Sequence, residues 1–527
     1  MSGITLSASV RQNLLSLQST ADLLSATQNR LATGKKVNTA LDNPTNYFTA
    51  SALDSRASDI NNLLDGIGNG VQILQAANTG ITSLQKLVDS AKSVANQALQ
   101  TQVGYSTKST ITANVAGATA SNLLGNFSSV AVTGTAVNND NTTAAAAITT
   151  ATQLVGTAGT GSNDLGTAIT NGSVLTINGK TLTFTTAQTT QTNDGNNNYT
   201  FGIGTGSTLT VGNVLSAIDS ITGGAASSIT AGKITLNTGT TSDLTIAGTN
   251  NVLTALGLSA GTTARTTALG GKTLTIQPTA GGATTNITFG TGANQISTLN
   301  QLNTTLASNN LQASVDSSGN IAITTTNDAA SSTIGALSGS ATAFSSLTPS
   351  APVADPTAQA TRASLVSQYN NIINQITTTA QDSSFNGVNL LGGDTLKLVF
   401  NETGKSTLSI TGVNFNPTGL GLSTLTSGTD FIDNAATNKV LSNLNNASTT
   451  LRSQASAFGS NLSIVEIRQN FSKSLINVLQ TGSSNLTLAD TNEEAANSQA
   501  LSTRQSIAVS ALSLANQSQQ SVLQLLR

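Results

Sequence analysis

The chain has 527 residues, of which 8% are charged and 3% are aromatic, and it contains no Cys, His or Trp. This composition excludes thiol nucleophiles, disulfide frameworks, histidine bases and Cys/His metal sites. A net charge of −2 with 21 thinly spread basic residues also excludes the electropositive surface of a nucleic-acid-binding protein.

The N-terminal segment carries a heptad pattern instead of a signal peptide. No basic start precedes an apolar run, and no stretch approaches the roughly 18 apolar residues of a membrane span, so we expect no membrane partner. Between residues 10 and 31 the apolar positions alternate spacings of four and three, with Gln28 as the interruption. They are Val10, Leu14, Leu17, Ala21, Leu24 and Leu31. Further leucines widen the apolar face, so this helix needs partners on more than one side.

A second and longer helix is predicted over residues 44–100, after a turn at 42–44 that places Pro44 in the first helical turn. Its heptad positions include Ile60, Leu64, Ile67, Val71, Leu74, Ile81 and Val88. Three glycines at 66–70 leave two interpretations open, because each costs about 1 kcal/mol inside a helix. Either the helix breaks there, or it continues and another helix approaches it closely.

The middle of the chain, residues 106–356, is rich in Thr, Ser, Gly and Asn, and its short alternating runs predict strands with one wet face. It contains an internal repeat: 178–184 matches 270–276, 199–202 matches 287–290, and 231–236 matches 318–323. A short helix signal lies between the strands in both copies. The repeat therefore predicts a duplicated β-β-α-β-β module, whereas the stretch 106–170 has no assigned structure.

The C-terminal end returns to heptads. One stripe contains Val440, Leu444, Ala447, Leu451 and Phe458, and the run from Ile464 to Val478 continues it after a shift. Residues 481–484 indicate a stop, and a last helix follows with Ile507, Ala511, Leu514 and Leu525 at heptad spacing and Val522 beside them. We expect the two terminal helices to pair with each other and their remaining apolar faces to pack on other chains.

Features that resemble catalytic or ligand-binding motifs have simpler explanations, and we expect no enzyme and no cofactor. Glu493 and Glu494 stand at a helix start, where acids complement the helix dipole. The glycine-rich segment 202–206 lacks the Lys and helix of a phosphate loop, which favours a turn after a strand. The cluster of Arg30, Lys35 and Lys36 is either a solvated linker or part of a salt bridge with another subunit.

Three segments resemble bacterial flagellin, the subunit of the flagellar filament. Residues 30–38 (RLATGKKVN) resemble its R-L-S-S-G-x-x-I-N segment, and residues 384–391 (SFNGVNLL) resemble its F-N-G-x-x-L-L hairpin entry. Residues 512–526 (LSLANQSQQSVLQLL) resemble its A-N-Q-x-x-Q-x-V-L-x-L-L terminus. The chain departs from the flagellin pattern in two places. The FNG segment follows the β-rich middle, and residues 42–48 (DNPTNYF) replace an acidic-Ala-Ala-Gly turn. Both departures point to an alphaproteobacterial or rhizobial type.

The resemblance implies a fold that is mainly α at the paired termini, a coiled-coil-like bundle with a β-hairpin segment, and an inserted α+β outer region. Residues 1–43 and 490–527 would form an inner core domain, and 44–105 and 357–489 a second helical domain. The insertion would span 106–356, with repeat modules at about 172–264 and 265–345. The long-helix seams given above, with Leu444, Leu451 and Phe458, would pack this second domain.

The function that the resemblance implies is a structural subunit that polymerises into the extracellular filament used for swimming. Its partners would be copies of itself, an export chaperone, and the hook–filament junction and cap proteins, after type III export without a cleaved signal peptide. Two alternatives are a hook-associated or junction protein and a surface adhesin. The stretch recognised by the animal toll-like flagellin receptor would fall on 89–96, where Ser90, Lys92 and Ser93 replace the family's pattern and indicate evasion of that receptor.

Overall fold

The computed structural model divides into two compact units that the chain visits alternately. The first contains residues 1–97, 365–426 and 438–527, and the second contains 98–364 and 427–437. The structure describes the backbone of residues 8–249 and 251–525, and the side chains of these ranges up to Ser521. Helices at the two ends of the chain and strands in its middle confirm the fold class predicted from the sequence.

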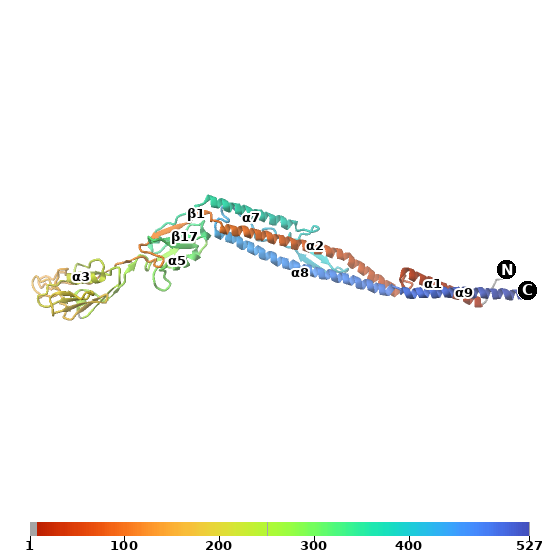
Figure 1. Ribbon diagram of the computed structural model, residues 1–527, viewed down its shortest axis with the longest axis horizontal. Helices are drawn as coiled ribbons and strands as arrows, with labels where there is room; N and C mark the ends of the chain where they lie inside the picture. Colours follow the sequence, from red (N-terminus) through yellow and green to blue (C-terminus); the bar gives the residue numbers. More distant parts are fainter. Residues whose placement is uncertain (1–7, 250, 526–527) are drawn as a thin grey trace. The chain divides into compact units, whose positions relative to one another are not determined.

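The first unit is a set of antiparallel helix pairs (Figure 1). Helix α1 lies along α9, and α2 lies along α8, where the Gln85 amide donates to the Ser448 hydroxyl at 2.8 Å. Ala57 and Ile60 of α2 pack with Ile476 and Leu479 of α8. The elements are α1 (Ala8–Thr33), α2 (Pro44–Gln100), α7 (Pro356–Asp382), β20 (Thr395–Val399), β21 (Thr407–Thr411), α8 (Asn434–Thr487) and α9 (Thr491–Leu525).

Helix α2 begins as predicted and crosses its three glycines without a break. Pro44 is its first residue, and the Asn43 side chain accepts a hydrogen bond from the Asn46 amide at 3.0 Å, as a helix cap does. A Cβ on Gly70 would fall 2.5 Å from Cδ2 of Leu398, so the glycine admits the β20–β21 hairpin. The close approach is therefore to a strand and not, as one interpretation had it, to a helix.

Helix α8 extends farther than the sequence predicts. The stop predicted at 481–484 is wrong, because the helix continues to Thr487. Gly482 is tolerated there because its neighbour Ser483 is buried in the helix pair, which outweighs a propensity cost of about 1 kcal/mol. The end is set instead at Thr487, whose carbonyl accepts hydrogen bonds from the Lys36 and Val37 amides at 2.7 and 3.3 Å.

The second unit contains two separate hydrophobic cores. The root core gathers buried residues from 111–124 and 269–344, and the outer core gathers buried residues from 148–258. Strands β1 (Tyr105–Thr107) and β19 (Val353–Ala354) pair with each other, and the root core lies between them in the sequence. Its elements are β2 (Thr110–Asn114), β14 (Thr273–Ile276), β15 (Thr285–Thr288), α5 (Leu299–Leu306), η1 (Ala307–Asn309), β16 (Leu311–Val315), β17 (Asn320–Thr325), η2 (Asn327–Ala329), β18 (Leu337–Ser338) and α6 (Thr342–Ser345).

The outer core is built on a six-stranded sheet of order β12-β11-β5-β6-β8-β7 and a three-stranded sheet of order β4-β10-β9. A short ribbon of β3 (Phe127–Ser128) and β13 (Thr266–Thr267) leads into and out of it. Its elements are β4 (Ala131–Thr133), β5 (Val174–Ile177), β6 (Lys180–Thr185), β7 (Gln191–Asn193), β8 (Tyr199–Gly202), α3 (Val211–Thr222), β9 (Ser228–Thr230), β10 (Lys233–Asn237), β11 (Leu244–Gly248), α4 (Val252–Ala255) and β12 (Gly261–Thr263).

The second half of the predicted repeat is closely matched in the two cores. Helices α3 and α5 both start with a capping box, formed by Thr210 with Asn213 and by Thr298 with Gln301. Each is followed by an antiparallel hairpin, β9–β10 or β16–β17, with a third strand added from upstream, β4 or β2. Residues 106–170, which had no assigned structure, thus contribute to both cores.

The first half of the repeat differs between the cores. Strand β6 pairs parallel with β8, whereas the equivalent strands β14 and β15 pair antiparallel. In the outer core β8 lies between β6 and β7 and pairs antiparallel with β7. After β7 the chain therefore turns back and places β8 between the two earlier strands. The residue spacing is similar in both copies, which is why the sequence repeat alone predicts a single topology.

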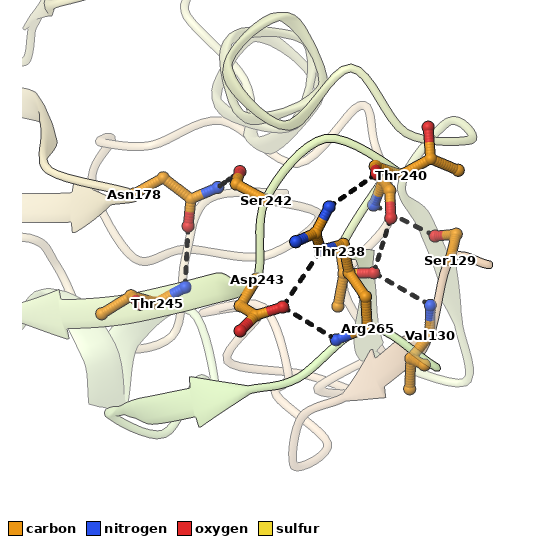
Figure 2. Close-up of polar contacts among 10 residues, drawn as sticks. Ser129, Val130, Asn178, Thr238, Thr240, Ser242, Asp243, Thr245 and Arg265 are labelled. Atoms are coloured by element: carbon orange, nitrogen blue, oxygen red, sulfur yellow. Dashed lines mark hydrogen bonds and ion pairs between the residues drawn. The ribbon is translucent and has the colours of Figure 1, made fainter. Parts of the chain in front are cut away.

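Two arginines of the second unit bind groups that are distant from them in the sequence. Arg265 donates to the Asp243 carboxylate at 3.1 Å and to the Thr240 carbonyl at 2.7 Å (Figure 2). Its guanidinium also lies over the Phe127 ring. Arg362 is buried, and its guanidinium donates to the carbonyls of Ala98, Thr101, Gln102 and Phe431. Burial lowers the pKa of Arg362 below its ordinary value, and nearby Asp433 opposes that shift.

Candidate assembly surface of the terminal helices

The α1–α9 pair is joined along a seam in which polar and small side chains alternate with leucines. From α1 the seam takes Val10, Leu17, Thr20, Leu24 and Thr27, which are buried or half-buried. From α9 it takes residues spaced by four and three: Glu494, Ser498, Leu501, Gln505, Ala508, Leu512, Ala515 and Gln519. The sequence prediction missed this α9 face because its polar members hide the heptad. The spacing of four and three from Glu494 was the signal that could have found it.

The large apolar side chains of this pair lie mostly outside the seam. On α1, Leu14 and Leu31 are 37% and 38% exposed, and Ala21 is half-buried. On α9, Ile507 is 65% exposed, Leu514 is 70% exposed, and Ala511 is exposed. The side chains of Val522 and Leu525 lie outside the described residues. Of the predicted packing residues, therefore, Val10, Leu17 and Leu24 lie in the seam with α9. Leu14, Leu31, Ile507, Ala511 and Leu514 form an apolar face that the described residues leave exposed.

An ion pair and a helix cap lie where α1 ends and α9 begins. Arg30 lies 3.4 Å from the carboxylate of Glu494, which is 11% exposed at its side chain. Glu493 and Glu494 stand in the first turn of α9, as predicted, and the Asp490 carboxylate caps it by accepting from the Asn492 amide at 2.9 Å. Arg30 thus pairs within the chain, which neither interpretation of its basic cluster anticipated.

The predicted seam between α2 and α8 is where the first unit buries its apolar side chains. Ile60, Ile67, Val71, Leu74, Ile81, Val88, Leu444, Leu451 and Phe458 are buried, and Leu64 is half-buried. Beyond Phe458 the seam continues through Val465, Ser472, Ile476 and Leu479. The shift of the stripe to Ile464–Val478 is therefore wrong: the seam keeps its heptad register, and the Ile464 run lies beside it.

That neighbouring run forms a second exposed apolar surface, which we call the α8 stripe. It comprises Ile464, Ile467, Phe471 and Val478, which are 43%, 64%, 60% and 66% exposed. Like the outer face of α1 and α9, it repeats at heptad spacing along one side of a helix. Both surfaces have the spacing of coiled-coil seams, and no helix among the described residues covers them.

The remaining candidate positions lie elsewhere in the molecule. Residues 202–206 form the turn after β8, as predicted. On α2, Ser90 and Ser93 are exposed, and the Lys92 ammonium lies 3.8 Å from the Asp89 carboxylate. Among the residues that the structure describes, no helix has the length and apolarity needed to cross a membrane.

Both helical ends match known families. Residues 5–124 match the bacterial flagellin N-terminal helical region, and residues 441–526 match the bacterial flagellin C-terminal helical region. Residues 200–292 match a domain of unknown function, DUF1522. That match runs from within β8 to just beyond β15, and so covers about one period of the repeat found in the sequence.

Curated relatives agree with this pattern. Flagellin FljM of Caulobacter vibrioides is 34% identical over 165 residues, which are 31% of this chain and 59% of that protein. Flagellin FljO of the same organism is 32% identical over 165 residues, with the same shares covered. Flagellin A of Rhizobium meliloti is 37% identical over 93 residues, or 18% of this chain and 24% of that protein. The chain thus spans 59% of the length of the Caulobacter flagellins named here.

Paired amphipathic end helices with exposed apolar side chains place the chain among proteins with coiled-coil-like helical termini. The matched terminal regions make the assignment specific: the two helical ends of the chain are similar to those of bacterial flagellins.

Proposed function

We propose that this chain is the structural subunit of an extracellular flagellar filament and polymerises with copies of itself. The observation that carries the proposal is the pair of uncovered apolar faces on helices that already have one partner in the chain. Heterologous contacts that do not close generate a helical polymer, and exposed heptad stripes supply such contacts. The low charge of these faces suits burial inside a tube of packed helices.

The partners and route implied by the family belong to the same proposal. An export chaperone would cover the terminal helices before assembly, and the junction and cap proteins would bound the polymer. Export through the flagellar type III apparatus without a cleaved signal peptide would carry the chain outside the cell. A chain without Cys or disulfides suits passage in an unfolded state.

Seeded polymerisation followed by negative-stain microscopy tests the proposal. The wild-type protein should form filaments, whereas the double variant Phe471→Ser/Leu514→Ser should stay monomeric while keeping its helical circular dichroism. Both side chains are at least 60% exposed in the single chain, so their loss leaves its core unchanged. The matched control is Val353→Ser, which removes an apolar side chain 55% exposed in the second unit. Filaments from the double variant would contradict the proposal.

A deletion separates the assembly surface from the outer core. Ser128 and Thr266 are paired neighbours in the β3–β13 ribbon, so residues 129–265 can be replaced by an Asn-Gly turn without disturbing the root core. We expect this variant to form filaments as the full chain does, because the exposed stripes lie entirely in the first unit. Loss of polymerisation in a folded variant would show that the outer core supplies a required contact.

We also propose that the filament subunit activates the animal toll-like flagellin receptor weakly. Ser90 is exposed, but its hydroxyl donates to the Lys86 carbonyl of its own helix at 2.9 Å. It lacks the planar donors and contact area of the arginine found at this place in detected flagellins. A receptor-reporter assay should show low potency for the wild-type monomer and a gain for Ser90→Arg, with Ser55→Arg on the same helix as control.

A further inference from the structure

The outer core is connected to the rest of the second unit through a short ribbon. The chain enters the outer core after β3 and leaves it before β13, and these strands pair over two residues each, Ser128 with Thr266 and Phe127 with Thr267. Among the described residues, the hydrophobic cores on the two sides of the ribbon share no buried side chain. A two-stranded ribbon is only marginally stable in water, so by itself it is a weak joint.

Arg265 contacts both the ribbon and the outer core. Its Cζ lies 3.9 Å from the centre of the Phe127 ring in β3. Its Nε donates to the Asp243 carboxylate at 3.1 Å, and its Nη1 donates to the Thr240 carbonyl at 2.7 Å (Figure 2). The Arg265 amide donates to the same Asp243 oxygen at 3.0 Å. One residue therefore joins β3 to the loop between β10 and β11.

That loop, residues 238–243, also binds the segment through which the chain enters the outer core. The Gly239 amide donates to the Ser129 hydroxyl at 3.1 Å. The Val130 amide donates to the Thr238 hydroxyl, and the Thr238 amide donates to the Val130 carbonyl, both at 3.0 Å (Figure 2). The loop is thus bound to the entering and to the leaving segment, and Thr238 is completely buried between them.

The contacts of Arg265 restrict its side chain more than an isolated surface ion pair would. Its side chain is 17% exposed, although that of Asp243 is 45% exposed. A single exposed ion pair stabilises little. A planar guanidinium that contacts a carboxylate, a carbonyl and an aromatic ring together is held in one orientation. Hydrogen bonds from the Arg265 amide and side chain lower the pKa of Asp243 below its ordinary value, so the carboxylate is charged at neutral pH.

We propose that Arg265 is a clamp that restricts movement of the outer core about the β3–β13 ribbon. A ribbon of two strands can bend and twist, whereas a side chain bound to both the ribbon and the 238–243 loop opposes both movements. Asp243 and Arg265 lie within residues 200–292, so the proposal gives a role to part of the region that matches the domain of unknown function. It does not rest on the proposed polymerisation.

Distances between two spin labels in the full-length monomer test the clamp. The chain contains no Cys, so labels attach only where Ser228→Cys in β9 and Gln312→Cys in β16 introduce one at an exposed position. Double electron–electron resonance should give a narrow distance distribution for the wild-type background. Arg265→Gln and Asp243→Asn should each broaden it about twofold, because the remaining ribbon is weak. The matched control is Lys233→Gln, which removes an exposed positive charge from the same core and should leave the width unchanged.

A second label pair separates movement of the outer core from its unfolding. Ser228→Cys and Thr192→Cys in β7 both lie in the outer core, so their distance distribution should stay narrow in Arg265→Gln. Broadening of this pair as well would show that Arg265 supports the fold of the outer core, and would overturn the proposal. A distribution between the two cores that is equally wide in wild type and Arg265→Gln would overturn it too. So would an Asp243→Asn variant that is as narrow as wild type.

Discussion

The two helix pairs of the first unit use the same heptad pattern in opposite ways. The α2–α8 pair turns its large apolar side chains inward, and Leu74, Leu444 and Leu451 are completely buried. The α1–α9 pair turns a mixed face inward, in which half-buried leucines stand among threonine, glutamine and alanine, and it leaves other large apolar side chains exposed, among them Leu14, Ile507 and Leu514. Burial of apolar surface contributes about 25 cal/mol per Å², so the first pair stabilises the single chain and the second pair does so only weakly. The difference indicates that one pair holds the subunit together and the other is kept for contacts between subunits.

The largest expected effect comes from a matched pair of phenylalanines on α8. Phe458 is 1% exposed in the seam, and Phe471 is 60% exposed in the α8 stripe. Phe458→Ala should lower the free energy of unfolding by about 3–5 kcal/mol, because it leaves a cavity. Phe471→Ala should change it by less than about 0.5 kcal/mol. Denaturant titration of both monomers measures the contrast, and equal losses would mean that the two faces are not distinct.

The buried arginine gives the next largest effect and shows how firmly the far end of α2 is fastened. Arg362→Met removes four charge-assisted hydrogen bonds to backbone carbonyls, including those of Ala98 and Thr101 at the end of α2. We expect a loss of about 3 kcal/mol, because buried carbonyls are left without donors. Arg468→Met, on an α8 residue whose cation stacks on Phe400, is the control and should cost about 1 kcal/mol or less. Comparable losses in the two variants would argue against a special role for Arg362.

Hydrogen exchange on the monomer should show which of the two helix pairs opens at the lower free-energy cost. Amides of α2 and α8 should open only with global unfolding, whereas α1 and α9 should open locally at a cost of about 0–2 kcal/mol, because few apolar contacts oppose their separation. Assembly should raise the protection of α1 and α9 far more than that of α2 and α8. Equal protection of both pairs in the monomer would mean that α1–α9 is as stable in the single chain as α2–α8.

The ion pair at the end of α1 should have a small effect that depends on salt. Glu494→Gln should lower stability by about 0.5–1 kcal/mol at low ionic strength, since Arg30 is 40% exposed and largely solvated. The difference from wild type should shrink at about 0.5 M salt, where screening is strong. Glu493→Gln, on the adjacent residue outside the seam, is the control. A salt-independent loss would point to packing by Glu494 instead of charge.

The smallest effect concerns the acid that shapes the turn before α2. Hydrogen bonds from the Thr39 and Asn38 amides lower the pKa of Asp42 below its ordinary value. Because the folded state binds the proton more weakly, this carboxylate stabilises the fold above its unfolded pKa, and the contribution is lost as the pH falls through its folded pKa. Asp42→Asn should therefore reduce the acid sensitivity of the turn below about pH 4. Exchange of the Thr39 amide reports it, and an unchanged pH profile would contradict this role.

The sequence by itself determined which segments are helices, that the two ends pair, and that the middle repeats. Periodicity and cap residues are local signals, so Pro44 with Asn43 and the two capping boxes could be found without a fold. The motifs at 30–38 and 512–526 likewise indicate flagellin from local sequence, and both lie within the matched terminal regions.

Only the tertiary structure decided which face of each helix turns inward and which strands pair. Helix α8 carries two apolar stripes, one through Val465 in register with Phe458 and one through Ile464, and their spacing alone does not say which of the two is buried. Strands β6 and β14 have similar sequences, yet their partners run in opposite directions, because pairing depends on crossovers far along the chain.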